Sequence, residues 1–436
     1  MNGRMDFERK LPTEPQDIAD IVTGILTVQA RFAREQKRPL GRGTHAKGVC
    51  VRATFEVFDI AKTVSDPTLA ARLARGLFAK PGVYQATVRF ANAASTIRPD
   101  SKPDVRAVSF AVELPAGAVG PDPARLDYSM NNAPTFPIND AHAFASFMRV
   151  QAAEGVLGHL RALLSLSFQD LKSFFQTTRN GLKQQYQPVH PYQRTRYWSN
   201  TPFLHGQDEA VKYSAIPAID NAAEPVGKGP NVLREELLRH VNRDQTQASF
   251  DFALQLLDAG RMTFKGQTRE PSFWIENGSV EWPDDQGPFH VVGRLTLQPK
   301  SQLSDAECEG WFIDVTKHSL PDHRPLGSIN RARWVAESAS RNARLGSGAV
   351  APAAQPTLAH RLAAITLGSL VKTVAIAAGA LALLVGGAAI WLIVETNRGV
   401  GMLPPESVDR VVYADQGWGP GVEAAPRQTY YYTAQG

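Results

Sequence analysis

The chain has 436 residues, 43% of them hydrophobic and 8% aromatic, so it is long enough to bury one large core or two smaller ones. This composition excludes a chain that is disordered throughout. The net charge of +5 comes from 47 basic and 42 acidic residues spread along the sequence, and without a clustered Lys/Arg stripe we expect no nucleic-acid partner. Cys50 and Cys308 show no metal-ligand spacing, and we expect both to be buried, reduced side chains of a reducing compartment.

The first predicted element is a helix over residues 13–37, where apolar residues recur at helical spacing behind a Pro-Thr-Glu-Pro start. Short β-rich runs separated by Gly, Pro and Asp turns begin at residue 49. Eight such runs predict an α+β fold built on a closed antiparallel eight-stranded β-barrel, because closure leaves no unpaired strand edge. The eight runs are VCVRATFEVF, VYQATVRFANA, DVRAVSFAVEL, RLDYSMNNAPTF, KYSAIPA, SFDFALQLL, RMTFKG and HVVGRLTL.

Between the two groups of strands, residues 156–182 predict one long amphipathic helix, and the aromatic, Pro-rich QQYQPVHPYQRTRYWSNTPF predicts an irregular covering loop. Further helices are expected over residues 231–240 and 325–345. The expected organisation is an N-terminal helical arm (1–37), a barrel domain (38–346), a small-residue, Pro-rich linker (347–366), a transmembrane helix (367–395) and a tail (396–436).

The transmembrane prediction rests on residues 373–394, which are uncharged over a length that crosses a hydrocarbon layer of about 30 Å. Basic residues precede this run and only Arg398 follows it closely, so the positive-inside rule predicts a single pass through an inner or plasma membrane with the barrel domain cytoplasmic. The tail would then lie outside, with membrane lipid as a partner. Its end, DQGW before YYYTAQG, resembles the opening of a periplasmic cytochrome-type domain, which implies a redox partner across the membrane.

Two motifs carry the chemistry. Arg42-Gly-Thr-His45-Ala-Lys-Gly precedes the first predicted strand, and Met130-Asn131-Asn-Ala-Pro-Thr-Phe136 ends the fourth. In this respect the chain resembles the catalases, which implies a barrel of catalase type that binds haem b. The resemblance implies that His45 transfers the peroxide proton as general base and acid, and that Asn131 orients the peroxide.

Other matches to catalases follow in chain order. Arg89, in Val-Arg-Phe, matches the arginine that pairs with a haem propionate, and Phe136 and Phe144 match pocket aromatics. Arg42 and Arg344 are expected to neutralise propionates together with Arg89.

The segment Arg333-Trp-Val-Ala-Glu337 aligns with the catalase helix that carries the axial tyrosine, but Glu337 stands in its place. No tyrosine occurs between Tyr213 and Tyr413 that a shifted alignment could supply. Two interpretations stay open: Glu337 is a replacement axial ligand, or it forms an ion pair with Arg333 at i and i+4 in a pocket that binds haem weakly or not at all. The second has more weight, because carboxylate is not among the usual ligands. His323 is a more remote candidate ligand.

Thr44 stands where catalases carry valine and where the catalase-like allene oxide synthases carry threonine. Its hydroxyl can hydrogen-bond the His45 imidazole and weaken it as a base toward hydrogen peroxide. The first functional hypothesis is therefore a membrane-anchored haem hydroperoxidase whose substrate is an organic or lipid hydroperoxide or hydrogen peroxide. The alternative is a catalytically inactive catalase-fold scaffold with weak or no haem.

Overall fold

The computed structural model describes residues 7–37, 39–115, 125–219, 221, 229–245 and 247–346. The chain divides into two compact units, and the first, Met1–Pro352, contains all of these residues. The expected linker, transmembrane helix and tail lie outside the described residues. Within the described ranges, no helix has both the length and the apolar character needed to cross a bilayer.

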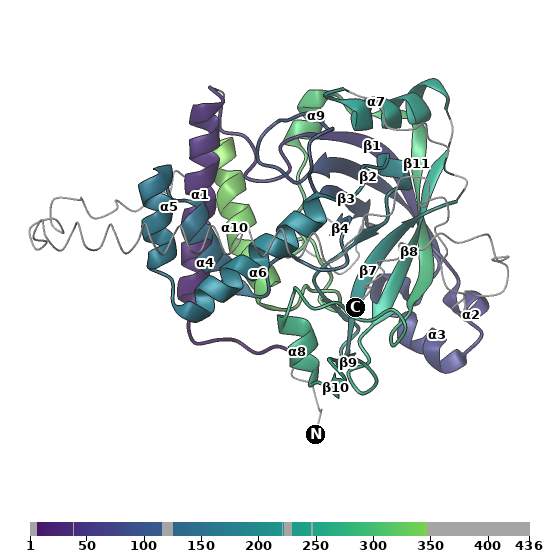
Figure 1. Cartoon of the computed structure of the whole chain (residues 1–436). Helices are drawn as coiled ribbons and strands as arrows, with labels where there is room; N and C mark the ends of the chain where they lie inside the picture. The colour runs from purple at the N-terminus through teal and green to yellow at the C-terminus, as the bar shows by residue number, and fades with distance from the viewer. Residues whose placement is uncertain are drawn as a thin grey trace, which may run out of the picture. The chain divides into compact units, whose positions relative to one another are not determined.

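The strands form a closed antiparallel barrel of eight strands (Figure 1). The ring runs β5-β4-β3-β2-β1-β11-β8-β7 and closes because β5 pairs with both β4 and β7; β6 adds to β7 beside the ring. The nine strands of this sheet are β1 (Gly48–Val57), β2 (Gly82–Asn92), β3 (Arg106–Glu113), β4 (Arg125–Asn131), β5 (Tyr197–Trp198), β6 (Phe203–His205), β7 (Glu209–Pro217), β8 (Ala248–Leu256) and β11 (Phe289–Gln302).

Alternation along the strands fills the barrel. In β1, Ala53, Phe55 and Val57 are buried, whereas Arg52 and Glu56 are exposed. The period of two directs one set of side chains inward, where burial of apolar surface stabilises the fold. Aromatic rings meet in the interior, with ring centroids 5.2 Å apart for Phe55–Phe252 and 4.7 Å for Phe110–Tyr128.

One of the eight strand predictions is wrong. RMTFKG contributes only β9 (Thr263–Phe264), which pairs with β10 (Gln267–Thr268) in a separate two-stranded sheet. The eighth barrel strand is β5, which lies in the segment predicted as a covering loop. A strand of two residues is too short to show alternation, so only its pairing with β4 and β7 reveals it.

The predicted helix 156–182 is two helices, because Ser167 caps the second by accepting a hydrogen bond from the Asp170 amide. The helix predicted over 231–240 is present as α7 and continues into the π-helical turn η3. The ends of α1 and α10 differ by no more than three residues from the predictions over 13–37 and 325–345. The helical elements are α1 (Glu14–Glu35), α2 (Ile60–Thr63), α3 (Pro67–Leu73), η1 (Gly76–Ala79), α4 (Ala141–Gln151), α5 (Gly155–Leu164), α6 (Phe168–Gln185), η2 (Tyr192–Arg194), α7 (Val232–Leu238), η3 (Arg239–Arg243), α8 (Pro271–Glu276), α9 (Asp305–Gly310) and α10 (Ser328–Leu345).

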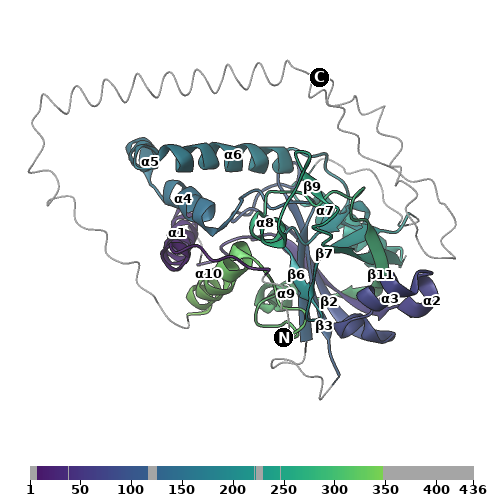
Figure 2. The same cartoon turned by 90° about the horizontal axis from the view of Figure 1, so that it is seen from below.

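Helices α1, α4, α5, α6 and α10 gather on one side of the barrel (Figures 1 and 2). Small residues allow close packing there: Ala141 and Ala145 of α4 and Ala332 and Ala336 of α10 share a buried cluster with Ile21 of α1. This cluster holds α10 in place beside the barrel.

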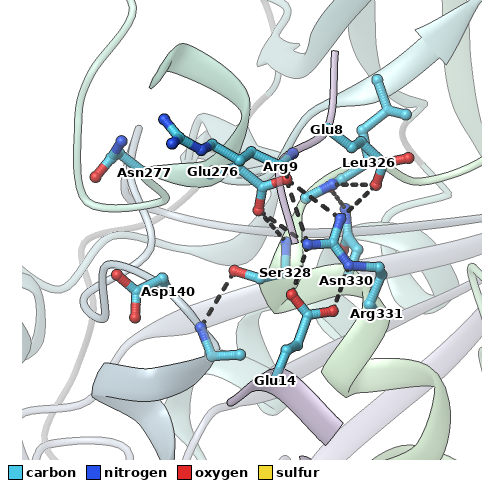
Figure 3. A network of polar contacts seen from close by, with 12 residues as sticks. Glu8, Arg9, Glu14, Asp140, Glu276, Asn277, Leu326, Ser328, Asn330 and Arg331 are labelled. Atoms are coloured by element: carbon cyan, nitrogen blue, oxygen red, sulfur yellow. Dashed lines mark hydrogen bonds and ion pairs between the residues drawn. The ribbon is translucent and has the colours of Figure 1, made fainter. Parts of the chain in front are cut away.

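An ion cluster fixes the start of α10 (Figure 3). The Arg331 guanidinium donates to the carboxylates of Glu8, Glu14 and Glu276, with shortest contacts of 2.6, 2.6 and 3.1 Å. Desolvation opposes the charge on Arg331, but the bonds to Glu14 and Glu276 outweigh it and raise the arginine pKa. The N-terminal segment, α1 and α8 therefore each contribute a carboxylate to the first turn of α10.

The cysteine prediction is also wrong. Cys50 of β1 and Cys308 of α9 form a disulfide, with their Cα atoms 5.5 Å apart across 258 residues of sequence. The two residues are buried with Leu303 and against Trp311. The sequence contained no spacing that would indicate the pair, because the barrel brings the two segments together.

Candidate functional site

The sheet register gathers the predicted site at one end of the barrel. Gly48 pairs with Ala91, Ala91 with Ala107, and Ala107 with Asn131, which in turn pairs with Trp198 at the closing strand. His45, three positions before Gly48, therefore lies at the same end of the barrel as Asn131.

His45 lies at this end in an unusual backbone conformation. Its φ is 56°, a left-handed value that costs a non-glycine residue roughly 1 kcal/mol or more. Main-chain bonds hold it, because the His45 amide donates to the Ala93 carbonyl at 3.1 Å. As expected, the Thr44 hydroxyl lies 3.1 Å from Nδ1 of the imidazole.

The His45 imidazole is neutral at ordinary pH. Desolvation, followed by the positive charges of Arg89, Arg333 and Arg42, lowers its pKa to about 3. Arg333 belongs to α10, so a charge from the second motif acts on this imidazole. A neutral imidazole has a free lone pair and can accept a proton.

Arg89 is a buried cation without a carboxylate partner among the described residues. One Nη donates to the His45 carbonyl at 2.8 Å, while Nε has no hydrogen-bond partner within the described part of the chain. Desolvation and the nearby charge of Arg42 lower its pKa to about 9. Gly48 makes room for it, since a Cβ there would lie 2.6 Å from the guanidinium. The arrangement is suited to an anion.

The Asn131 side chain is oriented by its neighbours. Its Oδ1 accepts from the Ala133 amide at 3.0 Å and from Asn200 Nδ2 at 2.9 Å. The Nδ2 group remains the donor that can face a ligand. Sequence analysis missed Asn200, whose amide also binds the Ala133 carbonyl and, at 3.2 Å, the Thr135 carbonyl, so that it holds the whole loop.

The two predicted aromatics meet. The Phe136 and Phe144 rings make a T-shaped contact with centroids 6.2 Å apart. Phe144 also packs against the cluster that contains Ala332 and Ala336 of α10. The pair therefore connects the loop after Asn131 with α10, the helix that carries Arg333 and Glu337.

On α10 the predicted ion pair is present. Arg333 Nε donates to Glu337 Oε1 at 3.0 Å, and its Nη1 lies 3.4 Å from Asn330 Oδ1. Asn330 Oδ1 also accepts from the Thr201 hydroxyl at 3.1 Å. Thr201 follows Asn200 in the chain, so residues 200–201 link the Asn131 side of the site with the Arg333 side.

Glu337 is a partly exposed residue of α10. Its side chain is 36% exposed, and desolvation is the largest influence on its carboxyl pKa, which it raises despite the charge of Arg333. His323 is not free to replace it as a ligand, because its Nε2 accepts from the Leu77 amide at 3.1 Å and its Nδ1 faces the Leu204 carbonyl at 3.4 Å.

Arg42 and Arg344, predicted to bind propionates, converge on Glu309. Arg42 Nη2 donates to the Glu309 carbonyl at 2.8 Å and its Nε to the carboxylate at 3.4 Å. Arg344 Nη1 contacts the same carbonyl and carboxylate at 2.9 and 3.1 Å. Glu309 is an exposed residue of α9 next to Cys308, so the disulfide holds the segment that supplies the counter-ion of both arginines.

The model of the family described as catalase matches residues 18–313, more than half of the chain and the whole of the His45, Arg89 and Asn131 arrangement. This chain belongs to the catalase family. The match ends before α10, so the assignment of Glu337 to the position of the axial tyrosine rests on the Arg333 motif.

Solved catalases share the fold. A fungal catalase has a TM-score of 0.52 at 17% identity, over 73% of this chain and 61% of that one. Catalase A from Saccharomyces cerevisiae has a TM-score of 0.52 at 17% identity, over 72% and 63%. This chain thus spans somewhat less than two thirds of these catalases. No curated protein matches it.

Among the described residues, Arg89, Phe136 and Phe144 have the chemistry that haem binding requires, whereas Glu337 differs from the tyrosine of catalases. The buried Arg89, with an unpartnered Nε, fits a propionate, and the Phe136–Phe144 pair fits the face of a macrocycle. The proximal helix offers a carboxyl in place of the phenol, although haem proteins usually use His, Cys, Met or Tyr.

Proposed function

We propose that this catalase-family chain is a haem-dependent hydroperoxidase at a membrane, acting on an organic or lipid hydroperoxide or on hydrogen peroxide. The observation that carries the proposal is the buried Arg89 guanidinium, which has no carboxylate partner within the described ranges and donates to the carbonyl of a neutral His45. A buried cation costs free energy unless a counter-charge joins it, so the site is built for an anionic ligand beside a base.

Haem, when bound, supplies the iron at which the O–O bond of a hydroperoxide is cleaved. The neutral His45 imidazole takes the proton from one peroxide oxygen and returns it to the other. Asn131 Nδ2 orients the hydroperoxide, because Asn200 holds the carboxamide by its oxygen. Arg89 would hold a propionate, and Glu337 is the residue that would face the iron on the proximal side.

The choice of substrate rests on Thr44. Its hydroxyl contacts Nδ1 of His45, and this bond restrains the imidazole that a small peroxide must use as its base. Together with the resemblance of Thr44-His45 to allene oxide synthases, this contact favours a larger organic hydroperoxide.

A second candidate function is a catalase-fold scaffold without turnover. The Arg333–Glu337 ion pair favours it, because a carboxylate that is bound to its own guanidinium is a poor axial ligand.

A hemin titration of the purified full chain decides between the two. The hydroperoxidase predicts a Soret band at about one haem per chain that disappears in the double variant His45→Ala, Glu337→Ala. A spectrum of free hemin for both proteins would leave the scaffold as the function.

We further propose that residues 373–394 anchor the chain in an inner or plasma membrane with the catalase-fold unit cytoplasmic, the tail outside and a redox partner across the membrane. The basic residues before the run support this orientation. The Cys50–Cys308 disulfide supports the opposite one, since such bonds persist in oxidising compartments. A C-terminal alkaline phosphatase fusion tests the proposal: activity places the tail outside, and inactivity places the catalase-fold unit there.

A further inference from the structure

Two consecutive helices, α5 and α6, leave an unusual number of large apolar side chains exposed. Phe168 is 87% exposed, Leu157 81% and Val156 80%. Although six of its ten residues are Val, Leu or Ala, α5 has no buried residue. Both helices run along the outer edge of the described part of the molecule, on the far side of α4 (Figure 2). The exposed apolar set, here called the α5–α6 face, is Val156, Leu157, Leu164, Phe168, Phe175, Leu182 and Tyr186.

On α6 the exposed apolar residues alternate with cations along one stripe. Phe168, Lys172, Phe175, Arg179 and Leu182 are spaced at i, i+4, i+7, i+11 and i+14, which places them on one side of a helix. All five are exposed. Aromatic and aliphatic groups interleaved with Lys and Arg are typical of helices that lie in a lipid headgroup region, where the long cationic side chains reach the phosphates.

The charge of this segment favours an anionic surface. Residues 155–185 contain Arg161, Lys172, Arg179 and Lys183 but one acidic residue, Asp170. The Asp170 carboxylate is bound by the Ser167 hydroxyl at 2.7 Å and by His142 Nε2 at 3.0 Å. A second copy of the chain meeting the face symmetrically would bring like charges together, whereas an anionic bilayer complements them.

The opposite side of α6 holds the loop that carries the site. Gln184 Nε2 donates to the Thr135 carbonyl at 3.0 Å and Asn180 Nδ2 to the Pro137 carbonyl at 3.2 Å. Gln187, just after the helix, accepts from Asn132 Nδ2 at 3.3 Å. The same helix therefore exposes an apolar, cationic stripe and supports the segment from Asn132 to Pro137.

We propose that the α5–α6 face lies in the headgroup region of an anionic membrane and holds the Asn131–Phe136 loop next to the bilayer. The inference deepens the proposed function, on which its relevance to lipid hydroperoxides rests. Membrane docking itself requires neither haem nor turnover, so the two can fail separately.

The test uses the full chain in vesicles of phosphatidylcholine and phosphatidylglycerol. Both native cysteines are paired, so an introduced cysteine is the one thiol open to an environment-sensitive fluorophore under non-reducing conditions. Phe168→Cys and Leu157→Cys report on the face. Val83→Cys on β2 is the matched control, because Val83 is a 67% exposed apolar residue of the barrel.

We expect the labels at 168 and 157 to shift their emission to the blue and to be quenched several-fold more by spin-labelled lipid than the label at 83. Lys172→Glu together with Arg161→Glu should reduce this quenching, as should high salt, while the circular dichroism spectrum stays unchanged. Hemin binding is measured on the same samples and is expected to be unaffected.

Three results would overturn the inference. Equal quenching at all three positions would show that the face does not contact lipid. A blue shift without vesicles that grows with protein concentration would assign the face to a second copy. A blue shift that depends neither on vesicles nor on protein concentration would mean that another segment of this chain, such as residues 373–394, covers the α5–α6 face.

Discussion

Arg89 donates from its guanidinium to the main-chain carbonyl of His45 at 2.8 Å. One buried cation therefore binds the left-handed backbone of the predicted base. Desolvation is the main cause that lowers the pKa of the imidazole, and the charge of Arg89 is the next. The guanidinium that would bind a propionate also positions the group that would move the peroxide proton.

Arg89→Met should weaken hemin binding by about tenfold or more, because a charge-assisted hydrogen bond contributes roughly 1.5–3 kcal/mol. The measurement is a hemin titration at neutral pH, where the guanidinium carries its charge. Arg294→Met, on the outer barrel surface where Arg294 pairs with Asp251, is the control and should match the wild type. Unchanged affinity in Arg89→Met would contradict the proposed propionate site.

His45 should contribute no ionisation to the activity profile between about pH 5 and 8, since its folded pKa is about 3 and its ordinary pKa is 6.5. The unfolded chain protonates this histidine first, so the folded state loses stability as the pH falls from 6.5 toward 3. His45→Gln should abolish turnover and show a smaller loss of stability in acid. Denaturant unfolding at several pH values checks the second effect. A parallel loss in both proteins would mean that His45 is not held neutral.

Glu337→Tyr should tighten hemin binding and raise hydrogen peroxide breakdown, because it supplies the phenolate that ferric haem prefers next to Arg333. Thr44→Val in the same background should raise the rate further by releasing Nδ1 of His45. Oxygen evolution and the Soret maximum are the measurements. If neither changes, Glu337 does not occupy the axial position.

Removal of the disulfide should destabilise the chain by about 2–4 kcal/mol, since the bond closes a loop of more than two hundred residues. Cys308→Ser with Cys50→Ser should also loosen α9 and weaken the contact of Glu309 with Arg42. Denaturant unfolding measures the loss. Mass spectrometry after alkylation of the unreduced, unfolded protein should detect no free thiol, and two alkylated cysteines would contradict the bond.

Arg331→Met should destabilise the chain by about 3–5 kcal/mol near neutral pH, because it leaves three largely buried carboxylates without their shared counter-ion. Arg234→Met, which removes a surface pair with Asp305, is the control and should cost less than about 1 kcal/mol. Equal losses in both variants would contradict a special role for the Arg331 cluster.

The sequence alone was sufficient to predict those features whose signal is local or periodic along the chain. Seven barrel strands were predicted because alternating side chains follow from the pleat, and α1 and α10 because apolar residues recur at helical spacing. The His45 and Asn131 motifs were found because short segments at the end of a strand keep their residue types together. The Arg333–Glu337 pair was predicted because residues four apart on a helix always meet.

Tertiary structure decided what depends on separation in sequence. Strand β5 is too short for a pattern and exists through its partners, and Cys50 meets Cys308 only because the barrel closes. Asn200 orients Asn131, and Glu309 pairs with Arg42. Neither residue stands out in the sequence, because its role depends on a partner far away along the chain. Hydrogen bonds and charges act over a few ångströms of space, and the distance along the chain does not determine which groups come that close.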